Sequence, residues 1–234
     1  MIYYENDNGI LYKGDILEEI RKIGNSTVDL IITSPPYNLG NNHHTNTKKT
    51  QCYDDNLPED EYQQWQIEII NECYRILKDN GSMFYNHKNR IRKGIQITPY
   101  EWLLKTNMII KQEIVWVNGS YNFDKIRFYP FTERIYWMTK SPKTKLINTL
   151  SKHDVFDRTE WKPVGTKNKH TRAFPLQMPL DIISCFPESE IILDPFMGSG
   201  TVALASEQLN KKWLGIELDK EFCDLTIDKV VKIN

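Results

Sequence analysis

Hydrophobic residues recur along the chain in two alternating patterns, short apolar runs and longer amphipathic stretches. Short runs such as VDLII (28–32) are typical of strands buried on both faces of a sheet. The stretch 58–81 spaces Tyr62, Trp65 and Ile69 at helical intervals, with proline at its start and glycine after its end. These patterns predict strands at 10–15, 28–34, 82–86, 109–118, 133–140, 190–196 and 212–218, and helices at 16–24, 58–81, 98–107, 174–186, 199–209 and 220–233.

Strands that alternate with helices indicate an α/β fold, a mostly parallel twisted sheet with helices on both faces. We expect one domain over residues 1–234, with a mobile loop in the polar, Asn-rich stretch 38–56. Sheets of this kind bind ligands at the carboxyl ends of their strands. Two unusual motifs, SPPY (34–37) and DPFMGSGT (194–201), each follow a predicted buried strand. We therefore expect the two motifs to meet at one edge of the sheet.

Composition fits a folded protein. The 234 residues are 40% hydrophobic and 12% aromatic, which is enough apolar material for a full core. The cysteines form no Cys-x-x-Cys pair, so we expect free thiols rather than a zinc site or a disulfide framework; they are Cys52, Cys73, Cys185 and Cys223. The polar N-terminus does not resemble a signal peptide, and no apolar run is long enough to span a membrane. We expect a soluble cytoplasmic protein.

Charge is uneven along the chain although the net charge is only −1. Residues 140–172 contain nine basic and three acidic side chains, a local net charge of +6, and HKNRIRK (87–93) contains four basic residues and no acid. Clustered basic residues can follow a phosphate backbone or simply form a solvated face. Charge alone does not decide between these interpretations.

The sequence around DPFMGSGT predicts a strand, a tight turn and a helix. Gly198 and Gly200 allow positive φ angles and let a ligand approach the backbone N–H groups of the turn. The turn lacks the Gly-Lys-Ser/Thr ending of a phosphate loop, and Ala203 replaces the third glycine of the dinucleotide fingerprint. Glu217 ends the next strand, where a carboxylate would accept hydrogen bonds from ribose hydroxyls. The alternative is a plain strand-to-helix turn with a surface glutamate.

Both motifs resemble those of the S-adenosylmethionine-dependent DNA amino-methyltransferases. DPFMGSGT is similar to the family's cofactor motif, and SPPY to its catalytic motif, Asp/Asn/Ser-Pro-Pro followed by an aromatic residue. The catalytic motif comes first here, which resembles the circularly permuted β subgroup and differs from protein-glutamine and many RNA amino-methyltransferases. That subgroup also carries a Gly-Asp near its N-terminus, here Gly14-Asp15. The resemblance covers about residues 10–228 and implies a Rossmann-like methyltransferase fold.

The resemblance also implies roles for individual residues. The target is an exocyclic amino group on a base that has left the duplex. The Ser34 hydroxyl would accept a hydrogen bond from this group, Pro35 and Pro36 would hold the local carbonyls stiffly, and Tyr37 would stack on the base. The alternative is a Pro-Pro turn with a core tyrosine. S-adenosylmethionine would be held by Asp15, Asp194, Pro195, Phe196, Gly198, Ser199, Gly200, Thr201 and Glu217.

Two histidine-containing segments complete the candidate sites. HTRAFP (170–175) resembles a segment that helps the family to bind the methionine part of the cofactor. His43 and His44 lack acidic or cysteine partners at metal-ligand spacing, so we expect solvated histidines and no metal site.

Ser34 and the His-x-x-x-Phe-Pro pattern are typical of cytosine-N4 enzymes, whereas adenine-N6 enzymes more often begin the motif with Asp or Asn. We therefore expect a site-specific methyltransferase for double-stranded DNA that acts on cytosine N4. The alternatives are an adenine-N6 enzyme, an RNA or protein methyltransferase of the same fold, and an inactive DNA-binding homologue. Target recognition is expected at 141–169, a short region that implies a short site, a homodimer or help from the 38–56 loop. A cognate restriction endonuclease would be a separate protein, because this chain is too small to include one.

Overall fold

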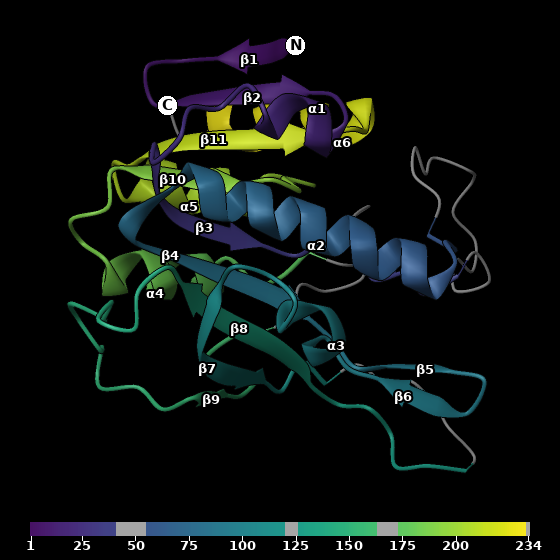
Figure 1. The fold of residues 1–234 in the computed structure, drawn as a ribbon. Coiled ribbons are helices and arrows are strands. Elements are labelled where there is room, and N and C mark those ends of the chain that lie inside the picture. The colour runs from purple at the N-terminus through teal and green to yellow at the C-terminus, as the bar shows by residue number, and fades with distance from the viewer. Residues whose placement is uncertain (41–54, 120–125, 163–172, 233–234) are drawn as a thin grey trace.

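The computed structural model describes residues 1–40, 55–119, 126–162 and 173–232. The centre of the molecule is a nine-stranded sheet, which runs in Figure 1 from β1 at the top to β9 at the bottom. The strands, in their order across the sheet, are β1 (Ile2–Glu5), β2 (Gly9–Lys13), β11 (Lys212–Glu217), β10 (Ile191–Asp194), β3 (Val28–Thr33), β4 (Leu77–His87), β8 (Glu133–Thr139), β7 (Ile109–Trp116) and β9 (Val155–Phe156). A separate hairpin pairs β5 (Arg90–Arg92) with β6 (Ile95–Ile97).

The five strands from β2 to β4 run parallel to one another. β1 and β8 pair antiparallel at the two sides of this block, β7 pairs antiparallel with β8, and β9 pairs parallel with β7. The sheet is therefore mostly parallel, as predicted. All five parallel strands end at the same edge, which we call the carboxyl edge and which faces right in Figure 1.

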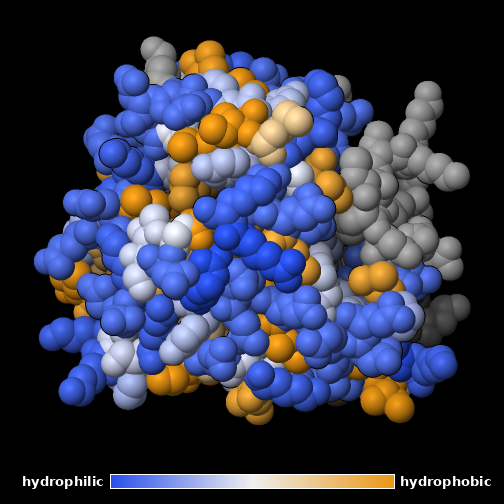
Figure 2. All heavy atoms as spheres, turned by 45° about the horizontal axis from the view of Figure 1, so that its top comes forward, coloured by the Kyte–Doolittle hydropathy of each residue, from blue (hydrophilic) through white to orange (hydrophobic). Residues whose placement is uncertain are grey.

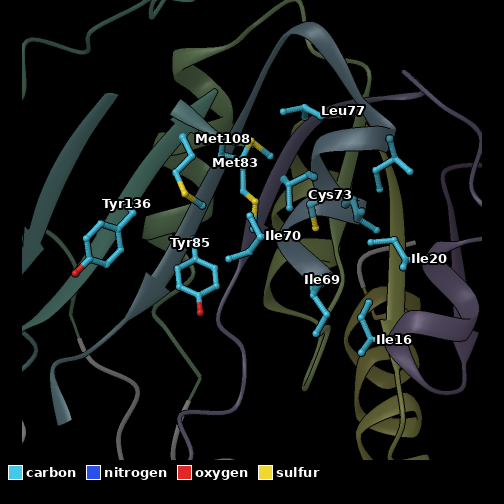
Figure 3. Close-up of a cluster of buried hydrophobic side chains, with 14 of the residues drawn as sticks. Ile16, Ile20, Ile69, Ile70, Cys73, Leu77, Met83, Tyr85, Met108 and Tyr136 are labelled. Atoms are coloured by element: carbon cyan, nitrogen blue, oxygen red, sulfur yellow. The ribbon is translucent and has the colours of Figure 1, made fainter. Parts of the chain in front are cut away.

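Helices cover both faces of the sheet. One face carries α1 (Ile16–Ile20), α2 (Glu59–Ile76) and α3 (Tyr100–Leu103), and the other carries α4 (Gln177–Cys185), α5 (Thr201–Gln208) and α6 (Lys220–Val231). Strand residues alternate between the two cores: Ile31 faces α1 and α2, whereas Leu30 and Ile32 face α4 and α5. Figure 3 shows the first core, where Ile69, Ile70 and Cys73 of α2 meet side chains from the sheet and from α1.

Some local predictions differ from the structure. The helix predicted over 58–81 ends at Ile76, and residues 77–81 begin β4. Leu77 has extended backbone angles (φ −69°, ψ 139°), pairs with Val28 and is fully buried. Its apolar side chain fits the helical stripe equally well, so pairing with β3 decides the boundary. The short strands β1 and β9 and the β5–β6 hairpin were not predicted.

Three cysteines lie in the described ranges, and all three are free, as predicted; they are Cys73, Cys185 and Cys223. Burial raises the pKa of the Cys185 thiol to about 11 and that of Cys223 to about 12, so neither is a reactive thiolate near neutral pH. On the face shown in Figure 2, hydrophobic side chains lie in small groups among hydrophilic ones. Within the described ranges, no helix is both long and apolar enough to cross a membrane.

Candidate active site

The two predicted motifs lie side by side at the carboxyl edge of the sheet. β3 delivers SPPY and its parallel neighbour β10 delivers DPFMGSGT. A direct hydrogen bond joins the two strand ends, from Thr33 Oγ1 to Asp194 Oδ1 at 2.8 Å. The same Asp194 oxygen accepts the Phe196 N–H at 2.9 Å. Asp194 thus fixes both the start of the glycine turn and its position beside the residue that precedes Ser34.

The glycine turn requires glycine for two different reasons. Gly198 and Gly200 both have positive φ angles, 53° and 76°. A Cβ on Gly200 would also lie 2.8 Å from Thr226 Cγ2 and 2.9 Å from Thr226 Cα, because α6 packs directly against the turn. The Met197 N–H donates to the Ile216 carbonyl at 2.9 Å, which ties the turn to β11 as well. The turn is therefore held from both sides, with α5 beginning immediately after it.

Glu217 lies at the end of β11 and turns its carboxylate back to the glycine turn. Its Oε2 accepts the Gly198 N–H at 2.7 Å, and its Oε1 accepts the Asp219 N–H at 2.8 Å. Burial raises the pKa of this carboxyl group. Each oxygen keeps a further lone pair for a ligand hydroxyl, since a carboxylate offers about four acceptor positions. These remaining acceptor positions therefore fit the ribose hydroxyls of S-adenosylmethionine.

The other predicted cofactor residues surround this turn in different ways. The carboxylate of Asp15 caps α1 by accepting from the N–H groups of Leu17 and Glu18, and Gly14 N–H donates to the Glu217 carbonyl. Phe196 is half-buried, with its ring centroid 5.7 Å from that of Trp65 on α2. The Ser199 hydroxyl faces α6, where it accepts from Lys229 Nζ at 2.8 Å. Pro195 and Thr201 are buried on either side of the turn.

Behind SPPY lies a chain of buried polar side chains. The Pro36 carbonyl accepts a hydrogen bond from the Tyr62 hydroxyl at 2.7 Å, and the same hydroxyl lies 2.8 Å from His87 Nε2. Gln66 Nε2 donates to the Tyr62 hydroxyl, and the chain continues through the Tyr85 hydroxyl to Trp102 Nε1. Burial lowers the pKa of His87 well below its ordinary value, so the imidazole is neutral. These contacts hold the second proline of the motif from the core side.

In front of this chain, Ser34 and Tyr37 share a second polar cluster with Asn86 and Glu133. The Ser34 and Tyr37 hydroxyls lie 2.8 Å apart, and the Tyr37 hydroxyl donates to Glu133 Oε2 at 3.0 Å. Asn86 Nδ2 donates to the Tyr37 hydroxyl at 2.8 Å and to Glu133 Oε2 at 2.9 Å. Burial first, and then the Glu133 charge, raise the pKa of Tyr37 well above 10, so the phenol keeps its proton.

The Tyr37 ring is held as well as its hydroxyl. Its centroid lies 4.5 Å from that of His87, and Lys88 Nζ lies 5.7 Å from the Tyr37 centroid. The chain leaves the motif through Asn38, whose N–H and side chain bond to Asp55 and Leu57. The two ends of the 38–56 loop are thus joined at its base, while residues 41–54, with His43 and His44, lie outside the described ranges.

Two arginines of HKNRIRK form hydrogen bonds within the protein. Arg90 is 3% exposed and forms a two-pronged ion pair with Glu59, at 2.6 and 2.9 Å. Its guanidinium also lies over the rings of Tyr62 and Trp102. Arg92 donates to the carbonyls of residues 38 and 57. These two arginines support the site from behind and are poor candidates for phosphate contacts.

The segment predicted for target recognition, 141–169, divides into two parts. Its first part follows the end of β8 at the edge opposite Ser34, and the N–H of Ile147 donates to the Cys185 carbonyl there. β9 then pairs with the end of β7, which returns the chain to the carboxyl edge. Trp161 stacks on Phe156 with ring centroids 3.7 Å apart. Arg158 and Lys162 beside them are exposed, whereas residues 163–169 and His170 lie outside the described part of the chain.

Four residues that hold the SPPY motif were not predicted from the sequence. Tyr62 was predicted only as part of the helical stripe, and Asn86, His87 and Glu133 were assigned no role. The available signal was polarity at strand ends: Asn86 and His87 end β4, and Glu133 begins the antiparallel strand β8, so all three reach the carboxyl edge. The described residues contain no cluster of three or more His, Cys, Asp or Glu side chains that could hold a metal.

Comparison with known proteins identifies the family of this chain. Residues 28–228 match a family model described as DNA methylase, which covers N6 and N4 methyltransferases. The type II methyltransferase M.BglII of Bacillus subtilis is 30% identical over an alignment that covers 92% of this chain and 67% of the relative. The type II methyltransferase M.HpaI of Haemophilus parainfluenzae is 27% identical, over 92% of this chain and 71% of the relative.

Solved structures show the same fold. The cytosine-N4-specific PvuII DNA methyltransferase superimposes with a TM-score of 0.78 at 21% identity, over 97% of this chain and 88% of that chain. The complex of M1.HpyAVI with S-adenosylmethionine (SAM) superimposes with a TM-score of 0.63 at 24% identity, over 94% and 98% of the two chains. From the family match, this chain belongs to the N6/N4 family of DNA methylases.

Proposed function

We propose that this protein methylates N4 of a cytosine flipped out of double-stranded DNA, as the modification enzyme of a restriction-modification system. The observation that carries the proposal is that the two motifs are adjacent. Thr33, the residue before Ser34 of SPPY, donates a hydrogen bond to Asp194, the first residue of DPFMGSGT. A serine at this position offers a hydroxyl acceptor without a negative charge. The type II names of the relatives support the restriction-modification context.

The residues of the turn would bind the cofactor. Glu217 would accept from the ribose hydroxyls, and the turn from Phe196 to Gly200 would line the methionine part. S-adenosylmethionine would supply the methyl group: the methyl carbon would pass from sulfur, which keeps the electron pair of the C–S bond, to the amino nitrogen, which would release one proton to solvent water. Thr33 and Asp194 hold the two halves of the site in register, so that the acceptor nitrogen is placed before reaction.

The residues of the catalytic motif would hold the base. The amino group of cytosine is a poor nucleophile, because its lone pair is delocalised into the ring. Ser34 Oγ and the Pro35 carbonyl would accept its N–H hydrogens and favour a more tetrahedral nitrogen. The ring face of Tyr37 that does not contact His87 would stack on the base. Tyr62 and Asn86 keep the motif in place while the base enters.

DNA contact is proposed for the second part of the 141–169 segment. Arg158 and Lys162 lie exposed near the carboxyl edge, whereas Lys152 in the first part pairs with Asp181. Because the segment is short, the proposal includes a short recognition site, a homodimer or help from the 38–56 loop, with any cognate endonuclease on a separate chain.

One experiment tests the function directly. The protein is incubated with tritiated S-adenosylmethionine and, in separate reactions, unmethylated phage DNA, RNA and a protein mixture, and labelled DNA is digested to nucleosides. The expected product is N4-methylcytosine in DNA. N6-methyladenine would replace the proposed base while keeping the reaction class. Label confined to RNA or protein, or no transfer at all, would overturn the proposed substrate.

A further inference from the structure

The cluster of Ser34, Tyr37, Asn86 and Glu133 contains one group that can only accept hydrogen bonds. A carboxylate has no proton to donate, whereas a serine or tyrosine hydroxyl can donate or accept and an amide can turn over. Glu133 is therefore the fixed point from which the direction of every hydrogen bond in the cluster follows. It stands at the start of β8, opposite Trp116 of β7, and its second oxygen accepts from Asn118 Nδ2 at 2.8 Å.

The Glu133 carboxylate determines which group donates in each hydrogen bond of the cluster. Tyr37 has one hydroxyl proton, and it must point to Glu133 Oε2, 3.0 Å away. The 2.8 Å bond between Ser34 and Tyr37 must then use the Ser34 proton. The Tyr37 oxygen now accepts from Ser34 and Asn86 and donates to Glu133, which fills its hydrogen-bonding capacity. Ser34 Oγ has given its proton to Tyr37 and also accepts from Asn86 Nδ2 at 3.3 Å, so it keeps one lone pair for a ligand.

Asn86 gives a second, independent sign that Glu133 sets the order. Its amide nitrogen has to face Glu133, at 2.9 Å, because two acceptors cannot face each other. The opposite atom, Asn86 Oδ1, is buried and has no hydrogen-bond partner among the described residues, although Asn86 is only 3% exposed. Leaving a buried acceptor unpaired is unfavourable. The amide adopts this orientation because the carboxylate requires it.

We propose that Glu133 is a positioning residue for methyl transfer, which orients the Asn86–Tyr37 cluster so that Ser34 Oγ presents a lone pair to the target amino group. This inference rests on the proposed role of Ser34 in the methyltransferase reaction. Without the carboxylate, the Tyr37 proton can turn to Ser34 Oγ. The Ser34 proton then points outward at the N–H hydrogens of the base, and two donors face each other.

The test uses Glu133→Gln, which keeps the shape and removes the charge. Single-turnover methylation of unmethylated phage DNA is measured with tritiated S-adenosylmethionine, together with the dissociation constant of the cofactor. We expect the methylation rate to fall about ten- to a hundredfold, as for loss of a hydrogen bond to a charged group. Cofactor affinity should change less than about twofold, because Glu133 contacts no residue of the glycine turn.

A double-mutant cycle separates orientation from general damage. Tyr37→Phe removes the hydroxyl that links Glu133 to Ser34 and leaves only the longer route through Asn86 Nδ2, 3.3 Å from Ser34 Oγ. E133Q should therefore lose much less in the Y37F background than in the wild type. The matched control is Glu113→Gln on β7, a glutamate paired with Arg134 that does not reach the cluster, and it should keep the wild-type rate. Additive losses from E133Q and Y37F would overturn the proposal, as would a full-rate E133Q.

The test also covers two other outcomes: an E133Q variant that does not bind the cofactor, and a wild-type protein that methylates adenine. If E133Q does not bind the cofactor, Y37F alone carries the test, and a wild-type rate in Y37F would overturn the inference. If the wild-type protein methylates adenine rather than cytosine, the proposed base is wrong. The cycle can still be measured on that amino group, so failure of the two proposals is distinguishable.

Discussion

Replacing Asp194 with asparagine should stabilise the protein, and the gain should be larger at alkaline than at mildly acidic pH. Asp194 is 2% exposed, and burial raises the pKa of its carboxyl group from an ordinary 3.8 to about 7. Between these two pH values the folded state therefore binds a proton that the unfolded state has lost. A raised pKa favours the folded state at low pH. The contribution of this carboxyl to the free energy of unfolding is therefore greatest below pH ~4 and falls as the pH rises through about 7.

The size of the effect follows from the gap between the two pKa values. Each unit corresponds to about 1.4 kcal/mol, so the buried carboxyl lowers the stability by about 4 kcal/mol at pH ~8, where it is ionised in the fold. At pH ~5.5 the loss is about 2 kcal/mol, because there the folded state must take up a proton that the unfolded state lacks. Asparagine has no charge to bury and can keep its Oδ1 for Thr33 Oγ1 and the Phe196 N–H. The stability of the variant relative to the wild type should thus rise by about 2 kcal/mol between these pH values.

Urea unfolding at pH ~5.5 and pH ~8, followed by circular dichroism, measures this difference. Comparing the variant with the wild type at each pH cancels the titration of every other group. A relative stability that is equal at the two pH values, or smaller at the higher one, would refute the argument. The same variant should bind S-adenosylmethionine more weakly. Unchanged affinity would remove Asp194 from the cofactor site and leave it only a structural role.

Three further predictions test the geometry of the site. In a urea titration, Gly200→Ala should lower the free energy of unfolding by about 2–4 kcal/mol, because alanine is strained in the left-handed conformation and its Cβ would clash with α6. The control Gly94→Ala has a φ of 81° but nothing within 4 Å of the added Cβ, so it should lower the free energy of unfolding by only about 1–2 kcal/mol. Tyr62→Phe should lower the free energy of unfolding by about 1–3 kcal/mol by leaving the Pro36 carbonyl unpaired, and a wild-type unfolding midpoint would contradict this. Tyr37→Ala should greatly reduce methylation while cofactor affinity stays close to wild type, and lost affinity with an unchanged rate would exclude the stacking role.

Most of the fold could be predicted from the sequence because its strands are short apolar runs and its helices carry clear stripes. Such patterns locate an element well but its ends poorly. Leu77 illustrates the limit: it continues the apolar stripe of α2, yet it pairs with Val28 as the first residue of β4. The β5–β6 hairpin was missed because each of its strands has only three residues, too few to show a pattern. Its arginines contact Glu59 and backbone carbonyls that only the folded chain brings near.

Only the part of the candidate site that consists of contiguous sequence motifs could be predicted. SPPY and DPFMGSGT are each continuous in sequence, and the rule that parallel strands end at one edge is enough to bring them together. The groups that hold SPPY are not continuous: Tyr62, Asn86 and Glu133 come from a helix and two strands. A helical stripe gives no sign that the Tyr62 hydroxyl will meet a proline carbonyl, and Glu133 resembles any charged residue at the start of a strand.

The structure explains why a motif with two prolines still needs these distant partners. Pro35 and Pro36 restrict the backbone, but they leave the carbonyl of Pro36 and the side chains of Ser34 and Tyr37 undetermined. Tyr62 fixes the carbonyl from the core side, and Asn86 and Glu133 fix the two hydroxyls from the side of β4 and β8. His87 contacts the Tyr37 ring, so the ring is oriented before any base arrives. In the proposed reaction, ordering these groups during folding would lower the entropy lost on binding the base and so help to position its weakly nucleophilic amino group.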